Sequence, residues 1–127
     1  MLAGLRGGRS GLSSWVSYHF EHLRRWREYT EKIAKAAREI LGEVDVYVIG
    51  GVAENRTTIY SDIDILIVVK GERLGDERKK LRIKILERAI DVHGLPWDAP
   101  VELHIVDEKR AEEYLRLTKE AIEIVPS

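Results

Sequence analysis

The chain has 127 residues, of which 44% are hydrophobic and 34% are charged, so it can form one compact domain and is too short for two independent cores. This composition excludes disordered, collagen-like and low-complexity chains. The chain contains no cysteine, which excludes disulfides, thiolate nucleophiles and thiolate metal ligands. A bound metal would therefore be held by oxygen or imidazole groups.

Sequence features that direct a protein to a membrane or out of the cell are missing. No apolar stretch approaches the roughly 20 residues that cross a bilayer, and the N-terminal MLAGLRGGRSG lacks the apolar region of a secretory signal. We expect a cytoplasmic protein with no membrane partner. One Asn and no Gln beside 43 charged side chains is a composition typical of hyperthermophiles, which indicates a thermophilic source.

Charge is distributed unevenly along the chain. Residues 1–41 carry eight Lys or Arg and four Glu, a net charge of +4, whereas the remainder carries −5. Arg24, Arg25 and Arg27 beside Trp26 could bind RNA. The glutamates interspersed among them favour the alternative, the solvated face of a helix. The sequence leaves binding of nucleic acid open.

The first predicted element is a long helix. After a flexible leader over 1–12, apolar residues recur every three or four positions and predict a helix over about 13–41, capped by Ser13 or Ser14. This length is unusual for a globular helix, so it could be two segments. Its apolar stripe, which we interpret as core or as an interface with a partner, consists of Trp15, Tyr18, Leu23, Trp26, Tyr29, Ile33, Ala37 and Ile40.

Two strands follow the helix. Alternating valines over 44–48 predict a half-buried strand that ends at Gly50 and Gly51, and residues 52–61 are typical of a loop. The segment 62–69, DIDILIVV, is almost wholly apolar after its two aspartates, which predicts a central strand.

The second half of the chain continues with a helix, a strand and a helix. Asp76 can cap a helix that runs to about His93 and is ended by a Gly-Leu-Pro sequence. A strand over 101–106 precedes a helix that is capped by Asp107 and extends to about Ala121. The last residues form either a short strand or the end of that helix.

The order of these elements indicates the fold class. We expect a single α/β domain of the α+β type over 13–127, with a small mixed sheet flanked by helices. Its core lies over 43–127, and no internal repeat is visible.

The two aspartates of the central strand require an explanation. Strand side chains alternate, so Asp62 and Asp64 project from one face and the isoleucines between and after them project from the other. Two neighbouring carboxylates repel each other, and a divalent cation offsets that cost. Mg²⁺ is usually held by carboxylates together with phosphate oxygens and waters, so the pair predicts a magnesium site for a phosphate-bearing substrate.

Other residues could complete such a site. Gly50 and Gly51 can bring backbone N–H groups close to a phosphate, although a plain turn would also explain them. Glu102 is an isolated acid on the later strand, and it is either a third acid on the aspartate face or a surface residue of an edge strand. His104 lies on the same face, and we interpret it as a surface or half-buried histidine outside the catalytic set.

These motifs together resemble the signature of a known superfamily. The sequence VIGG at 48–51 followed by SDIDIL at 61–66 resembles that of the DNA polymerase beta-type nucleotidyltransferases, and the length resembles their minimal nucleotidyltransferase branch. The small Ala53 and an Asn55 able to adopt the left-handed conformation fit that branch. The resemblance implies a nucleotidyltransferase-like fold, ATP or another NTP as substrate and a two-metal Mg²⁺ site.

The resemblance also implies roles for particular residues. The third acid in this family can deprotonate the acceptor hydroxyl, a role that falls to Glu102. The implied metal-binding and catalytic residues are Asp62, Asp64 and Glu102, and the implied nucleotide- or phosphate-binding residues are Gly50, Gly51 and Ser61.

Two positions depart from the pattern and leave two functions open. Gly51 stands where the branch often has Ser, and Glu54 replaces a commonly basic residue, so Arg56, Lys70 or the basic first helix would have to supply positive charge. The first function is Mg²⁺-dependent transfer of a nucleoside monophosphate to an unknown acceptor hydroxyl. The alternative is an antitoxin-like protein that binds a HEPN-type RNase, with weak or no catalysis. The nucleotide and the oligomeric state, a homo-oligomer included, stay open.

Overall fold

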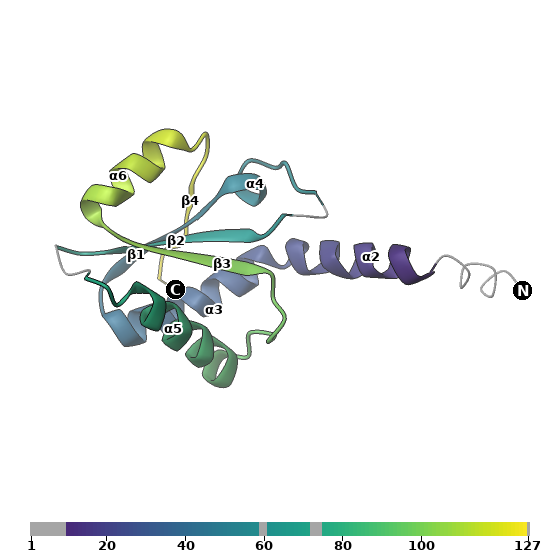
Figure 1. The fold of residues 1–127 in the computed structure, drawn as a ribbon, viewed down its shortest axis with the longest axis horizontal. Coiled ribbons are helices and arrows are strands. Elements are labelled where there is room, and N and C mark those ends of the chain that lie inside the picture. Colours follow the sequence, from purple (N-terminus) through teal and green to yellow (C-terminus); the bar gives the residue numbers. More distant parts are fainter. Residues whose placement is uncertain (1–9, 59–60, 72–74, 127) are drawn as a thin grey trace, which may run out of the picture.

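The computed structural model describes residues 10–58, 61–71 and 75–126 (Figure 1). It confirms the expected α/β fold class. None of the helices in these ranges is long and apolar enough to cross a membrane. The elements are α2 (Ser10–Arg24), α3 (Trp26–Leu41), β1 (Val44–Ile49), α4 (Gly50–Ala53), β2 (Ile63–Val69), α5 (Arg78–His93), β3 (Val101–Asp107), α6 (Glu108–Leu117) and β4 (Ile122–Glu123).

The strands form one mixed sheet in the order β3-β2-β1-β4. Strand β1 is antiparallel to both of its neighbours, and β2 runs parallel to β3. The apolar strand β2 is therefore interior, as its composition predicted, because only a strand covered on both faces can bury so many aliphatic side chains.

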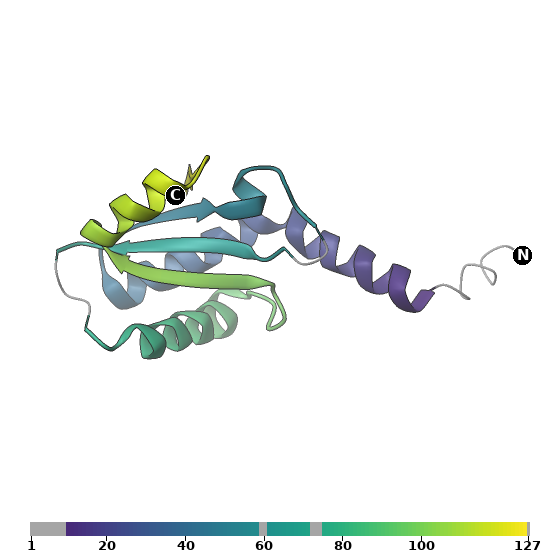
Figure 2. The same ribbon diagram turned by 45° about the horizontal axis from the view of Figure 1, so that its top comes forward.

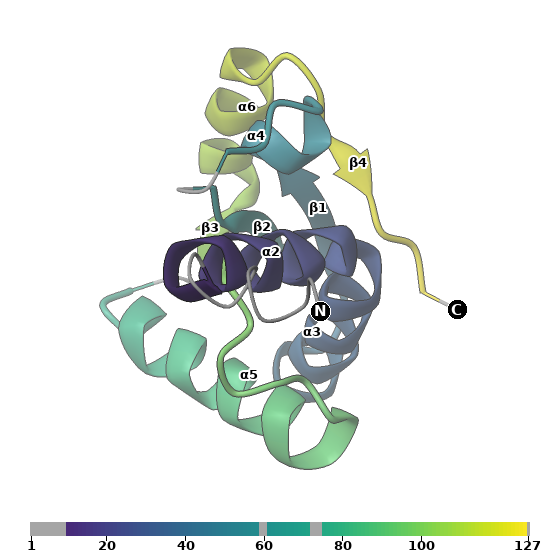
Figure 3. The same ribbon diagram turned by 90° about the vertical axis from the view of Figure 1, so that its right-hand side faces the viewer.

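Helices cover the two faces of the sheet unequally (Figure 3). Helices α3 and α5 cover one face, where they pack on the odd-numbered residues of β2 and β3, such as Ile65 and Ile105. Helix α6 covers part of the opposite face through Ala111, which packs with Leu66 and Val106. Nearer the start of β2 and β3, the side chains of Asp64, Glu102 and His104 on this face are 28%, 59% and 25% exposed, so this end of the face is only partly covered.

The N-terminal helix differs from the prediction in its extent. It begins at Ser10, inside the expected leader, so Ser13 and Ser14 lie within the helix and are not its cap. As its predicted length allowed, it is two helices that meet at Arg25. At that point the Arg25 N–H donates to the His22 carbonyl at 3.1 Å, a tighter i to i−3 turn that ends α2 before α3 begins.

The apolar stripe is buried in the core in its later part and is exposed in its first part. Tyr29 and Ile33 of α3 are fully buried, but Trp15 and Tyr18 of α2 are 53% and 56% exposed. The physical reason is that α2 extends past the end of the sheet (Figure 2), so that among the described residues neither side chain joins the core, and Tyr18 contacts Asp98 through its hydroxyl at 2.6 Å.

Several other boundaries also differ. Part of the expected loop is the single helical turn α4. Asp76 is not a cap, because α5 follows Glu77 and lacks a side-chain cap hydrogen bond. Helix α6 ends at Leu117 rather than Ala121, since Thr118 is extended and the chain turns to pair β4 with β1. The cap by Asp107 is confirmed, with its carboxylate accepting from the Arg110 N–H at 2.8 Å.

Candidate active site

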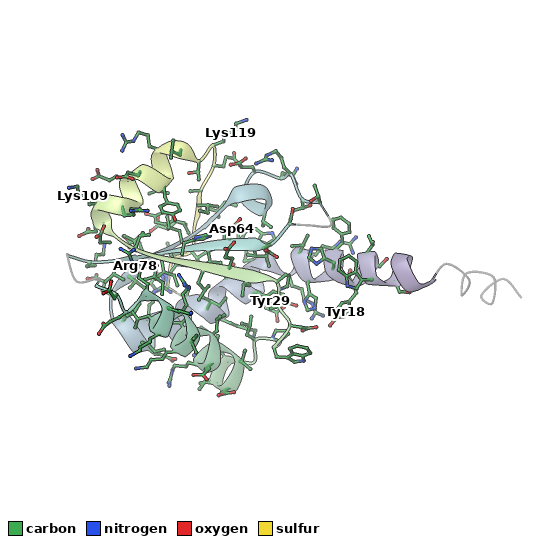
Figure 4. All side chains as sticks on the ribbon, in the orientation of Figure 1. Tyr18, Tyr29, Asp64, Arg78, Lys109 and Lys119 are labelled. Atoms are coloured by element: carbon green, nitrogen blue, oxygen red, sulfur yellow. The ribbon has the colours of Figure 1, made fainter. Side chains whose placement is uncertain are left out.

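Strand register brings two acids and a histidine together on the open end of the sheet. The parallel pairing places Asp64 opposite Glu102, so both side chains project from one face. His104 projects from the same face two residues further on, and its Nε2 lies 3.3 Å from Asp64 Oδ1 and 3.9 Å from Glu102 Oε1. The three residues offer ligand atoms within 4.8 Å of one another. Figure 4 shows Asp64 on β2 among the surrounding side chains.

Exposure separates these three side chains. The carboxylate-bearing side chains of Asp64 and Glu102 are 28% and 59% exposed, and the imidazole of His104 is 25% exposed. Glu102 can thus reach a bound molecule, while Asp64 and His104 are more buried. Strand-to-strand hydrogen bonding fixes all three backbones, so their separation is set by the sheet.

The two carboxylates change the protonation of the imidazole. The hydrogen bond with Asp64 raises the pKa of His104, and the negative charges of Asp64 and Glu102 act in the same direction. Partial burial and the positive charge of Arg82 oppose this rise in the pKa. The two carboxylates therefore favour the positively charged form of the imidazole.

Gly50 is required by the position of Asp64. Its φ is +76°, and a Cβ at this position would lie 2.6 Å from Asp64 Oδ2, well inside van der Waals contact. The end of β1 can approach the Asp64 carboxylate only because Gly50 has no side chain.

Gly51 lies against the loop that carries Ser61. A Cβ on Gly51 would lie 3.1 Å from the Arg56 carbonyl oxygen and 3.5 Å from Ser61 Oγ. The Arg56 N–H donates to the Gly51 carbonyl at 2.7 Å, and Asn55 between them has the left-handed φ of 57° that the sequence predicted. The glycine pair and the loop thus form one tight turn beside the acids.

Ser61 connects this turn to α2. Its Oγ accepts the Thr58 N–H at 2.8 Å and lies 3.5 Å from the Thr58 hydroxyl oxygen, and a hydroxyl can accept and donate at the same time. Its carbonyl oxygen lies 2.9 Å from Nε2 of His19 on α2. The N-terminal helix therefore contacts the residue directly before Asp62.

The structure brings only some of the predicted site residues together. Asp64 and Glu102 converge as expected, and Gly50 lies against Asp64. Asp62 is exposed, precedes β2 and lies outside the group of three. His104, which the sequence interpretation set aside, belongs to the group. Its spacing of two residues from Glu102 was the available signal, because that spacing puts both on one face of a strand.

The basic residues considered for the site are held in ion pairs. Arg56 donates to Glu54 through Nε at 2.9 Å and Nη2 at 2.5 Å, and this hydrogen bonding lowers the pKa of Glu54. Lys70 pairs with Asp45 at 2.8 Å, which raises the pKa of Lys70. Lys70 also follows the far end of β2, about 20 Å along the strand from Asp64 at roughly 3.3 Å per residue.

Comparison with known proteins gives a family and a fold. A family model described as a nucleotidyltransferase domain matches residues 30–123. A crystal structure from Sulfolobus solfataricus, provisionally assigned as a nucleotidyltransferase, is similar with a TM-score of 0.56 and 22% identity over 83% of this chain and 84% of that one. A second provisionally assigned nucleotidyltransferase has a TM-score of 0.50 and 22% identity over 73% of this chain and 94% of its own. The search of curated proteins gave no match.

Proposed function

This chain belongs to the nucleotidyltransferase domain family, and we propose that it transfers a nucleoside monophosphate from ATP or another NTP to an acceptor hydroxyl in a Mg²⁺-dependent reaction. The convergence of Asp64 and Glu102 beside Gly50 is the observation that carries the proposal. A pair of acids on one sheet face is costly without a cation, and the missing side chain of Gly50 lets the turn after β1 lie directly against the Asp64 carboxylate.

The residues present fit magnesium. Asp64 and Glu102 supply oxygen ligands, and the proposed set also includes Asp62 at the entrance of β2. When bound, Mg²⁺ would neutralise charge on the triphosphate and help to orient it. Gly50 and Gly51 would contact phosphate oxygens through the backbone, and Ser61 would donate its hydroxyl hydrogen to one of them.

Glu102 is suited to accept the proton of the acceptor. It is the most exposed of the three grouped side chains, so an incoming hydroxyl can reach its carboxylate. The acceptor oxygen forms a bond to the α-phosphorus, the bond from the α-phosphorus to its bridging oxygen breaks, and pyrophosphate leaves. The proton moves to Glu102. Most of the rate enhancement would come from positioning and charge stabilisation.

Transfer of the α-phosphate tests this proposal. Protein, α-labelled ATP and Mg²⁺ are incubated with an extract of the source organism that supplies acceptors, and incorporated label is counted. The double variant Asp62→Asn, Asp64→Asn should lose incorporation and Mg²⁺-assisted ATP binding in calorimetry, with unchanged circular dichroism. Asp45→Asn is the control, because Asp45 belongs to the same sheet but pairs with Lys70 at 2.8 Å. Transfer retained by the double variant would contradict the proposal.

A second function is favoured by the exposed part of α2. Trp15 and Tyr18 are more than half exposed on a helix that extends past the sheet (Figure 1), and Arg56 and Lys70 are held in ion pairs rather than left for a triphosphate. We propose as the alternative that the chain is an antitoxin-like partner of a HEPN-type RNase, bound through α2, with weak or no catalysis.

Co-purification distinguishes the two functions. The chain is co-expressed with the product of a neighbouring gene, tested for HEPN-type RNase activity, and the complex is captured through that product. Trp15→Ala with Tyr18→Ala should abolish capture if α2 is the interface. Trp97→Ala is the control, because Trp97 is 83% exposed but lies outside α2. A complex without label incorporation supports the alternative, and label incorporation without a complex contradicts it.

A further inference from the structure

His104 lies within the proposed metal site, yet the proposed reaction gives it no role. Its Nε2 is nearer to Asp64 Oδ1, at 3.3 Å, than to Glu102 Oε1, at 3.9 Å. We propose that His104 is a nitrogen ligand of the metal, so that the site of Asp64, Glu102 and His104 binds divalent first-row transition ions in preference to Mg²⁺. This inference rests on the proposed function, because both concern the same site.

The separations of the three ligand atoms fit one coordination sphere. With metal–ligand bonds of about 2.1 Å, neighbouring ligand atoms of an octahedron lie about 3 Å apart and opposite ones about 4.2 Å apart. The separations of 3.3 Å and 3.9 Å fall inside this range, and all three ligand atoms lie within 4.8 Å of one another. Small side-chain rotations can therefore point all three atoms at one ion.

The scaffold holds His104 where a ligand is needed. Its backbone lies in β3 between Leu103 and Ile105, which are 4% and 2% exposed and anchor the strand to the core. The imidazole also lies near the ring of Tyr114 on α6, with ring centroids 5.8 Å apart. Because the strand cannot shift without disturbing the core, the imidazole is directed toward the acids before any ion binds.

The chemistry of the donor set determines which ions are preferred. Mg²⁺ favours oxygen ligands, whereas an imidazole nitrogen adds most to the binding of transition ions. In a site with two carboxylates and one imidazole, His104 is therefore the group that favours transition ions over Mg²⁺. Asp62, which lies outside the group, would serve an oxygen-only site but does not replace the nitrogen.

Electron paramagnetic resonance with Mn²⁺ as the probe tests the inference. Untagged protein is titrated with Mn²⁺, with and without Mg²⁺ as competitor, and the bound ion is examined for electron spin echo modulation by a coupled imidazole nitrogen. The wild type should show this modulation, and protein labelled with ¹⁵N-histidine should show the altered pattern of the heavier isotope. This second measurement needs no substitution and does not depend on how variants fold.

The variants assign the nitrogen to its residue. His104→Ala should lose the modulation and about tenfold or more in Mn²⁺ affinity, since removing even an indirect partner of a metal ligand costs 10- to 100-fold. Its Mg²⁺ affinity should change much less. His93→Ala is the control, because His93 also contacts a carboxylate but lies on α5 and not in the proposed site. Its Nε2 is 2.7 Å from the carboxylate of Glu39. It should keep the modulation.

The outcomes separate this inference from the proposed function. Mn²⁺ that binds without nitrogen modulation, and that is lost in Asp64→Asn, would overturn the role of His104 while leaving the proposed transferase site intact. A His104→Ala variant that loses Mn²⁺ and Mg²⁺ affinity equally would also overturn it, because His104 would then act only by orienting Asp64. Binding of neither ion, in the presence or absence of ATP, would refute both.

Discussion

The substitution Gly50→Ala separates the stability of the fold from the geometry of the site. Gly50 has a φ of +76°, a left-handed conformation that costs a residue with a side chain about 1–2 kcal/mol. The free energy of unfolding should fall by that amount, and the melting temperature by roughly 4 °C for each kcal/mol at this chain size. The new methyl group would also lie 2.6 Å from Asp64 Oδ2, so the Asp64 carboxylate has to rotate away.

Gly94→Ala is the matched control for this prediction. Gly94 has a nearly identical φ of +75°, but the nearest atom to its Cβ position is the end of the Lys32 side chain at 3.9 Å. Both variants should therefore lose similar stability in thermal unfolding, and only Gly50→Ala should lose Mg²⁺ and Mn²⁺ affinity in titrations. Equal metal affinity in Gly50→Ala and the wild type would refute the claim that Gly50 makes room for Asp64.

Three further predictions concern stability. Tyr29→Phe removes the hydroxyl that lies 2.7 Å from Nδ1 of the buried His22, and should lower the free energy of urea unfolding by about 1–3 kcal/mol; no loss would show that this contact contributes nothing. Asp107→Ala removes the cap of α6 and should cost about 1 kcal/mol in the same assay, whereas Asp107→Asn should cost less. Hydrogen bonds from Arg88 and His93 lower the pKa of Glu39, so its stabilising contribution is present above the ordinary value of 4.5 and is lost as the pH falls through the lowered one. The difference in the free energy of unfolding between the wild type and Glu39→Gln should accordingly be largest near neutral pH and should disappear in acid. A difference that persists in acid would contradict this expectation.

Short-range patterns predicted much of the fold correctly. The alternating valines of β1 and the aliphatic run of β2 form the half-buried and interior strands that they indicated, because alternation and composition report directly on which faces are covered. Asp107 and Gly94 mark helix ends as expected, since capping depends on local backbone geometry. Boundaries without such a signal, such as the start of α5, were predicted less well.

The exposure of α2 could not be predicted from its apolar spacing. The apolar spacing that includes the buried Tyr29 also includes Trp15 and Tyr18. Burial, however, requires another element to pack against, and α2 extends beyond the end of the sheet (Figure 2). The break at Arg25 likewise lacks a proline or glycine that would have indicated it.

The sequence by itself determined which residue types could form the site. It placed Asp64 on an apolar strand, Gly50 at the end of the preceding strand, and Glu102 and His104 on one face of a later strand, because these relations follow from the period of two in a β-strand. Only the tertiary structure decided that Asp64 pairs with Glu102, that His104 joins them and that Asp62 stays outside the group. Register between strands 38 residues apart depends on how the whole sheet packs against its helices, and no local pattern contains that information.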